Sequence, residues 1–193
     1  MAVLIQSLSR MSTRAKAALF GACGEALSPL LADVERLTSG RWTFPDSRVA
    51  LDAVARFVVG GAAQADYADL RDRLLASGPN GHELDSPWST YAQDALTCID
   101  AALVASSLSA EEFRDVWIEF AVEPMVASLN ARGYDVWHEP VPAGGSSLQV
   151  ELDNVVEFLA ETAVWLSQSD EVTSSDYTEL IREAAVIRPP FDP

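Results

Sequence analysis

The sequence predicts an all-α protein, a single-domain bundle of about seven or eight helices that spans residues 1–193. Three observations lead to this prediction. Apolar residues recur at three- and four-residue spacing along most of the chain, as on the buried face of a helix. Proline, glycine and serine cluster between these stretches and mark helix starts and stops. Neither a repeat nor a low-complexity linker divides the chain, and 193 residues are enough for one well-buried core.

The first helix is expected at about residues 12–27, where alanines and leucines line one face. Ser28 and Pro29 follow, and this pair is typical of a helix cap with proline at the first helical position. The sequence therefore predicts a break here, and then a second, short helix that ends at Ser39-Gly40.

A third helix is expected after an aromatic loop. Asp46 or Ser47 should cap it, because either side chain can accept a hydrogen bond from a free backbone N–H. This helix should end at the glycine pair 60–61. A fourth helix, at about residues 62–76, ends at the clearest turn cluster of the chain, residues 77–81.

Ser86-Pro87 predicts the start of a fifth helix. A capping box at residues 109–112 opens a sixth, and an irregular loop rich in aromatic residues and proline is expected at about residues 134–147. Two amphipathic helices close the domain, at about residues 148–167 and 174–186. Trp165 falls on the apolar stripe of the first of these two and is expected in the core.

A strong charge imbalance lies over this helical pattern. The chain has 29 acidic side chains against 13 lysines and arginines, a formal net charge of −16. Such a protein repels nucleic acid and anionic membranes and attracts basic proteins. We therefore expect a basic protein partner, and no binding to nucleic acid or membrane.

The location expected from the sequence is the cytoplasm. The apolar start of the chain is too short for the core of a signal peptide and lacks a basic region before it. No run approaches the roughly 18 apolar residues of a membrane span. Cys23 and Cys98 lie among alanine and leucine in predicted helices, so we expect two buried free thiols, although spacing alone leaves a disulfide open.

No catalytic residue, cofactor or metal is expected from the motifs of the chain. The glycine pairs match neither the Walker pattern nor the dinucleotide fingerprint, and there is no Gly-x-Ser-x-Gly elbow. A di-metal site in a helical bundle uses Glu-x-x-His pairs, and the sequence contains none.

Five residues are candidates for binding a partner. Asp153, Glu157 and Glu161 lie four residues apart and line one ridge of a helix, roughly opposite its core stripe. This ridge is either a surface for a basic partner or a solvated face. Trp42 and Trp137 lie in predicted loops, where an exposed aromatic side chain can anchor an interface, unless the loop packs onto the core.

Two His-Glu pairs in predicted loops are the alternative candidates, for catalysis or metal binding: His82-Glu83 and His138-Glu139. If the two loops converge, a histidine serves as base or metal ligand and the glutamate orients it. The other interpretation is two surface histidines beside solvated carboxylates.

Three alanine-rich stretches resemble a known family: residues 18–30 (ALFGACGEALSPL), 48–56 (RVALDAVAR) and 91–103 (YAQDALTCIDAAL). They are similar to helices of a bacterial domain-of-unknown-function family, number four hundred and sixteen. The resemblance weakens after Gly133. It implies an all-helical fold and supplies no catalytic residue. Some relatives look like immunity proteins from bacterial toxin loci.

The leading hypothesis is a non-catalytic, acidic protein-binding module, an immunity-type inhibitor that neutralises a basic toxin or nuclease. Acidic helix faces would steer the partner, and aromatic side chains would supply the affinity. Two alternatives stay open. One is a small hydrolase or metal-dependent enzyme that uses the His-Glu pairs, and the other is a homo-oligomeric scaffold whose helix faces pair with themselves.

Overall fold

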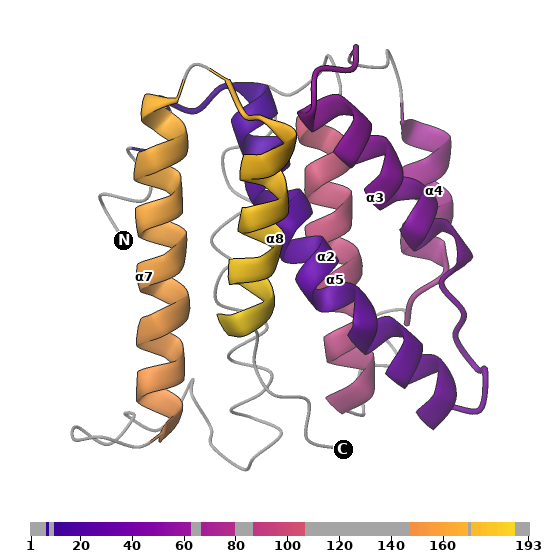
Figure 1. Ribbon diagram of the computed structural model, residues 1–193. Helices are drawn as coiled ribbons and strands as arrows, with labels where there is room; N and C mark the ends of the chain where they lie inside the picture. The colour runs from indigo at the N-terminus through magenta and orange to yellow at the C-terminus, as the bar shows by residue number, and fades with distance from the viewer. Residues whose placement is uncertain are drawn as a thin grey trace.

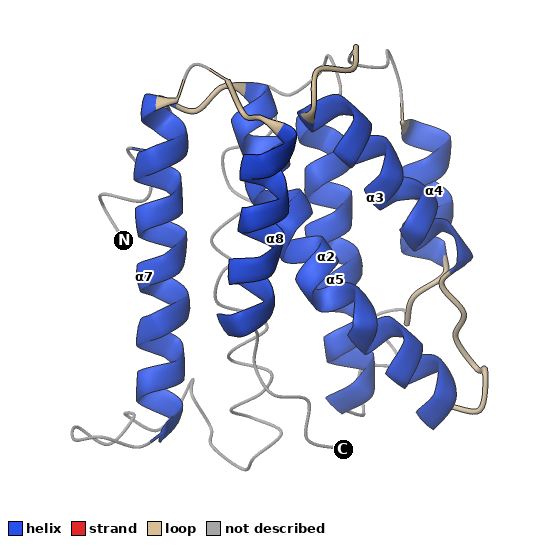
Figure 2. Ribbon diagram, viewed as in Figure 1, coloured by secondary structure: helices blue, strands red, loops and turns tan. Residues whose placement is uncertain are grey.

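The chain folds into a helical bundle, shown in Figure 1 as a computed structural model. The structure describes residues 7, 10–62, 67–79, 87–106, 147–169 and 171–187. These ranges hold six helices and no strand (Figure 2), which confirms the all-α prediction. The helices are α2 (Thr13–Leu37), α3 (Pro45–Val58), α4 (Ala68–Ala76), α5 (Pro87–Ala105), α7 (Ser147–Gln168) and α8 (Ser174–Ile187). The helix expected from residue 109 lies outside these ranges, as does nearly all of the expected aromatic loop.

Helix α2 is the centre of the bundle and packs against α3, α5, α7 and α8. Thirteen of its 25 residues are buried, more than one amphipathic stripe supplies, and seven of the thirteen are alanine or glycine. These small side chains let other helices approach closely. At the crossing with α5, a Cβ on Gly24 would lie 3.0 Å from Ile99 Cγ1 and 3.6 Å from Ile99 Cα. The two backbones are therefore nearly in contact at this glycine.

Helix α2 is also the one helix, among those the structure describes, that is long and apolar enough to cross a membrane. However, 67% of that stretch is buried inside the protein. A helix surrounded by other helices needs an apolar surface on several sides. Its place at the centre of the bundle therefore accounts for its composition.

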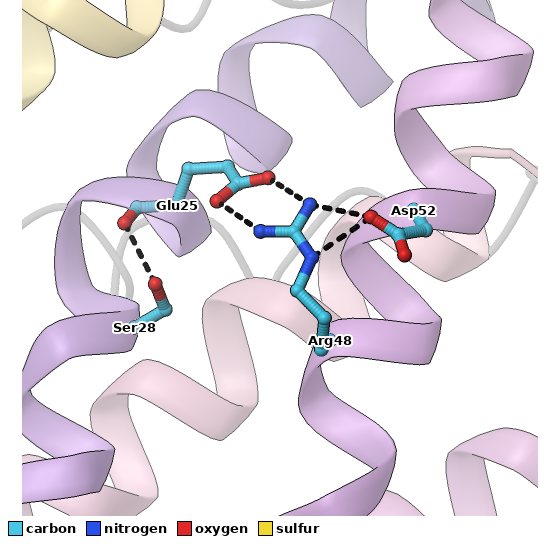
Figure 3. Close-up of polar contacts among 4 residues, drawn as sticks. All are labelled: Glu25, Ser28, Arg48 and Asp52. Carbon is cyan, nitrogen blue, oxygen red and sulfur yellow. Dashed lines mark hydrogen bonds and ion pairs between the residues drawn. The ribbon is translucent and has the colours of Figure 1, made fainter.

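The break expected at Ser28 and Pro29 does not occur, because α2 runs straight through this pair. Proline lacks the N–H that would bond the carbonyl of Glu25, four residues earlier. The Ser28 hydroxyl donates a hydrogen bond to that carbonyl instead, at 3.0 Å, as Figure 3 shows. Pro29 itself is exposed, so its ring meets solvent and not a neighbouring helix. Ser28 thus keeps α2 continuous. The sequence pattern had predicted a helix cap at this residue and two separate helices.

The side-chain cap expected from Asp46 or Ser47 is also wrong. Helix α3 begins at Pro45, and Phe44 precedes it without a side-chain cap. The backbone N–H of Phe44 instead donates to Glu35 Oε1 on α2 at 2.8 Å. Glu35 thus binds the backbone of the residue that precedes α3, and no side chain caps the first turn of the helix itself.

Arg14, in the first turn of α2, caps the C-terminal end of α3. Its guanidinium donates to the carbonyl oxygens of Phe57 at 2.6 Å, Val58 at 3.3 Å and Gly61 at 3.2 Å. It also lies 4.8 Å from the centre of the Phe57 ring. A cation suits this position because the last carbonyls of a helix carry partial negative charge. The helix ends at Val58, before the glycine pair that predicted its end, and Gly60 has φ of 105°.

Three arginines tie neighbouring helices together in the N-terminal half. The pairs are Arg48–Glu25 between α3 and α2 (2.8 Å), Arg73–Asp46 between α4 and α3 (3.2 Å) and Arg71–Asp100 between α4 and α5 (2.6 Å). Arg48 also bonds Asp52, one turn along α3, so its guanidinium lies between two carboxylates (Figure 3). The hydrogen bond to Glu25 is the main reason that the pKa of Arg48 is raised. The carboxylates of these pairs are half-buried and the arginines more exposed, so each pair contributes on the order of 1 kcal/mol and orients the helices more than it stabilises them.

The other helix boundaries follow the sequence signals, with one exception. Helix α5 begins at Pro87, and α7 and α8 each lie within one residue of the expected ends. Helix α4 begins at Ala68, later than the expected residue 62, because Tyr67 just before it has a non-helical backbone conformation.

Helix α8 docks on α2 through Tyr177, which is 4% exposed. Its hydroxyl has no hydrogen-bond partner within the described residues, and burial raises the pKa of this phenol. The hydroxyl lies over Gly21, where a Cβ would be 2.5 Å from Tyr177 Oη and 2.8 Å from Val54 Cγ1. Only glycine leaves space for the tyrosine ring at this crossing.

This crossing can be tested by stability measurements. Tyr177→Phe should leave the free energy of unfolding unchanged or raise it by up to about 1 kcal/mol, because the hydroxyl is desolvated without a partner. Gly21→Ala should lower it by about 1–3 kcal/mol through overpacking. In the variant that carries both substitutions, the loss of unfolding free energy should be smaller. The new Cβ then overlaps with Val54 Cγ1 but no longer with the Tyr177 hydroxyl. Urea unfolding of the four proteins gives these values. A loss above about 1 kcal/mol in Tyr177→Phe would contradict an unpartnered hydroxyl.

The cap supplied by Arg14 gives a second prediction. Arg14→Lys should lower the free energy of unfolding by about 1.5–3 kcal/mol, because one ammonium group cannot bridge three carbonyls and stack on Phe57. Thermal or urea unfolding measures the loss. Arg10→Lys, at an exposed arginine just upstream, is the matched control and should change stability by less than about 0.5 kcal/mol. Equal effects of the two substitutions would remove the capping role.

Candidate functional site

An open groove runs between α7 and α8, with a volume of about 310 Å³. The two helices are antiparallel and are joined at one end by a short connection (Figure 1). Eight side chains line the groove: Phe158, Glu161, Thr162 and Trp165 from α7, and Asp176, Glu179, Leu180 and Glu183 from α8. Most of its wall is carbon, although four carboxylates stand around it.

Helical spacing explains why these residues share the groove. On α7 they lie three, four and seven positions after Phe158, and on α8 the same intervals follow Asp176. Residues at these intervals form one face of a helix. The core stripe of α7, with Leu159, Ala163 and Leu166 buried, lies beside this face. Each helix therefore has one face in the core and an adjacent face that borders the groove.

Trp165 corrects an expectation, since it is 40% exposed and not in the core. It precedes the buried Leu166 by one position, which turns its side chain about 100° away from the core stripe, toward the groove. Large aromatic side chains with one open face are frequent anchors of protein interfaces. The groove thus combines an apolar wall with an exposed tryptophan.

Two of the four carboxylates already accept hydrogen bonds. Thr173 and Asp176 form a capping box at the start of α8: Asp176 N–H donates to Thr173 Oγ1 at 3.2 Å, and Thr173 N–H donates to Asp176 Oδ2 at 2.9 Å. The hydrogen bonds from Thr173 lower the pKa of Asp176. One turn along, Arg182 Nε donates to Glu179 at 2.9 Å, and this bond lowers the pKa of Glu179. Both groups are therefore charged at neutral pH.

The α7–α8 hairpin concentrates the negative charge of the protein. Residues 147–187 contain nine acidic side chains and one basic side chain, Arg182. Their net charge of −8 is half of the −16 carried by the whole chain. This local count of charge is the sequence signal that could have identified the hairpin as the candidate site.

The acidic ridge predicted on α7 is only partly recovered. Glu157 and Glu161 are exposed, and the side chain of Asp153 lies outside the described part of the chain. Glu161 borders the groove, whereas Glu157 does not line it. Glu161 therefore groups with the carboxylates of α8 across the groove, and not with its neighbours along α7.

Trp42 does not have the exposed position that an interface anchor needs. It is 7% exposed, and the guanidinium of Arg41 lies 5.0 Å from the centre of its ring. The loop between α2 and α3 packs onto the core and takes this tryptophan with it, the alternative that the sequence left open. Trp137 lies outside the described residues.

The residues of the alternative catalytic or metal site, His82, Glu83, His138 and Glu139, all lie outside the described ranges, so that hypothesis stays a prediction. Within those ranges no three His, Cys, Asp or Glu side chains are grouped to hold a metal. Cys23 and Cys98 are free, as expected. Burial raises the pKa of both thiols, that of Cys23 to about 12, so neither is a thiolate nucleophile at neutral pH.

A second hollow, of about 300 Å³, lies between α3 and α4. Arg56, Arg73 and Asp69 mix both signs of charge on its wall. Arg73 is already bonded to Asp46 and to the carbonyl of Asp69. This hollow therefore favours no single class of ligand, and the α7–α8 groove is the stronger candidate site.

No protein-family model, curated protein or solved structure matches this chain. The resemblance to the domain-of-unknown-function family stays a prediction. The site must be interpreted from its own chemistry.

The capping box gives a prediction for the α8 wall of the groove. Thr173→Ala should lower the free energy of unfolding by about 1 kcal/mol at pH 7, as loss of a threonine N-cap usually does. The lowered pKa of Asp176 stabilises the fold above the unfolded value of 3.8, and this contribution is lost as the pH falls through the folded value. The effect of Thr173→Ala should therefore shrink as the pH falls below the unfolded value of 3.8 and through the lower folded value.

Unfolding by urea at pH 7 and at low pH measures the change. Ser175→Ala, at an exposed serine in the same turn, is the control and should have a small, pH-independent effect. A pH-independent loss in Thr173→Ala would show that the Asp176 carboxylate takes no part in the cap.

Proposed function

We propose that this protein is an acidic protein-binding module, and that the α7–α8 groove is the site where it binds a basic segment of another protein. The observation that carries the proposal is the half-exposed Trp165 on an apolar wall bounded by four carboxylates. This combination offers both an anchor point and a charge preference. The binding itself requires no catalytic group.

The two kinds of side chain in the groove have separate roles. An apolar residue of the partner that enters the groove contributes about 1.5–3 kcal/mol when it is fully buried. The carboxylates contribute mainly to the association rate and to the choice of partner, because a field of one sign steers an oppositely charged protein. The hairpin that forms the groove has a net charge of −8, half of the charge of the whole chain, which favours a basic partner at this end of the bundle.

The more specific proposal is an immunity-type inhibitor that neutralises a basic toxin or nuclease. A nuclease needs a basic surface, because it binds a phosphate backbone. An acidic protein with an apolar anchor is complementary to such a surface and blocks it by occupying it. The net charge of −16 and the resemblance to immunity-like relatives both support this proposal.

Charge reversal on the groove tests the function. The tagged protein is first used to capture its partner from a lysate of the source organism, and the purified pair is then studied by interferometry. Glu183→Lys should slow association about 3- to 10-fold and flatten its dependence on salt, because it removes a charge that steers the partner.

Asp72→Lys is the control, since Asp72 is exposed and its helix α4 lies across the bundle from α7 (Figure 1). It makes the same change in net charge and should leave the association rate within about twofold. Equal effects of the two substitutions, or no effect of either, would move the binding site away from the groove.

A further inference from the structure

We infer that the occupant of the groove is a basic amphipathic α-helix of the partner protein, which contacts α7 and α8 over two helical turns. This inference rests on the proposed function, since it specifies which kind of segment the groove binds. It follows from the spacing of the groove side chains and from their differing hydrogen-bond states.

The spacing of the carboxylates matches a helix. At a rise of 1.5 Å per residue, Asp176, Glu179 and Glu183 follow one another along α8 at about 4.5 and 6 Å. A helical partner repeats its own face at the same three- and four-residue intervals, so it stays in register with all three. An extended chain repeats one face every 6.8 Å or so and loses register within two repeats.

The length of the groove also fits two turns. Phe158 and Trp165 stand seven residues apart on α7, as Asp176 and Glu183 do on α8, so both walls are about 10.5 Å long. Apolar side chains at positions i, i+3 or i+4, and i+7 of a docked helix span the same distance. This is the usual pattern of a helix that binds in a groove.

The carboxylates divide into two pairs with different roles. Asp176 and Glu179 already accept hydrogen bonds from Thr173 and Arg182, so they add to the field but are less available for new bonds. Glu161 and Glu183 accept no such hydrogen bond among the described residues, although the charge of Arg182 also interacts with Glu183. These two are therefore the carboxylates that pair with arginine or lysine on the flanks of the incoming helix. An arginine at the end of the groove where Trp165 stands can also stack on its exposed ring.

Charge disfavours two occupants that this chain could supply, a second copy and the helix predicted from residue 109. A second copy has a net charge of −16 and is repelled. The predicted helix that begins at residue 109 has five acidic side chains and one arginine in residues 109–123. A separate, basic helix is the occupant that complements the groove.

Designed peptides test the inference. Peptide one has about 18 residues, enough to form a helix once bound, with leucine at helical three- and four-residue spacing and arginine on both flanks. Peptide two has the same composition with leucine at every second position. Peptide three replaces every arginine of the first with glutamate. Fluorescence anisotropy of labelled peptides measures binding to the full chain.

Peptide one should bind at least about tenfold more tightly than peptides two and three, and circular dichroism should show that it becomes helical. Glu161→Gln with Glu183→Gln should weaken its binding about tenfold, and Trp165→Ala should weaken it further. Asp69→Asn with Asp72→Asn, at two exposed positions of α4, makes the same change in net charge. This double variant is the control and should leave the binding unchanged. The glutamine substitutions are nearly isosteric and keep the test valid if Trp165→Ala does not fold.

Several outcomes overturn the inference. Tighter binding of peptide two, abolished by Glu161→Gln with Glu183→Gln, would place an extended segment in the groove and leave the proposed function intact. Equal losses in the Glu161→Gln/Glu183→Gln variant and the Asp69→Asn/Asp72→Asn variant would reduce the effect to overall charge. If peptide one does not bind, and Glu183→Lys also has no effect on the captured partner, the helix and the proposed function both fail.

Discussion

The bundle depends on how closely its other helices approach α2. Gly24 leaves little space beside Ile99 of α5, and Gly21 leaves space for Tyr177 of α8 and for nothing larger than hydrogen. Because protein interiors are packed like crystals, a change of one methyl group at such a contact moves the neighbouring helix. Helix α8 is one wall of the groove, so small residues in the core determine where that wall stands. The packing of the core therefore also determines the shape of the candidate site.

Sequence patterns predicted the helical class and most helix ends because these depend on residues close together in the chain. They failed where a different group took over a local role. A serine hydroxyl replaces the bond lost at Pro29 and keeps α2 continuous. Glu35, on another helix, accepts the hydrogen bond from the backbone N–H of Phe44, and neither Asp46 nor Ser47 forms the expected cap. The clamp that Arg14 forms on α3 links residues more than 40 positions apart and has no local signature.

The sequence predicted the acidic character of the candidate site but not its position between α7 and α8. The acidic pattern on α7 pointed to Glu161, which borders the groove, but the pattern cannot show which flank of α7 the next helix covers. That placement leaves Trp165 half-exposed, whereas Trp42 is buried because the loop between α2 and α3 packs onto the core. The number and the role of the arginines also differ between the two halves of the chain. In the N-terminal half several of them tie helices together, while the α7–α8 hairpin has one arginine among nine acidic side chains.

The contact between Tyr177 and α2 determines when this side of α2 can be covered during translation. Tyr177 follows Gly21 by 156 residues, so at about 5–20 residues per second the ribosome needs roughly 8–30 s to deliver the tyrosine after the glycine. Throughout that interval the flank of α2 that α8 covers lacks this cover. That flank is therefore shielded late, because α8 is the last of the described helices to be synthesised.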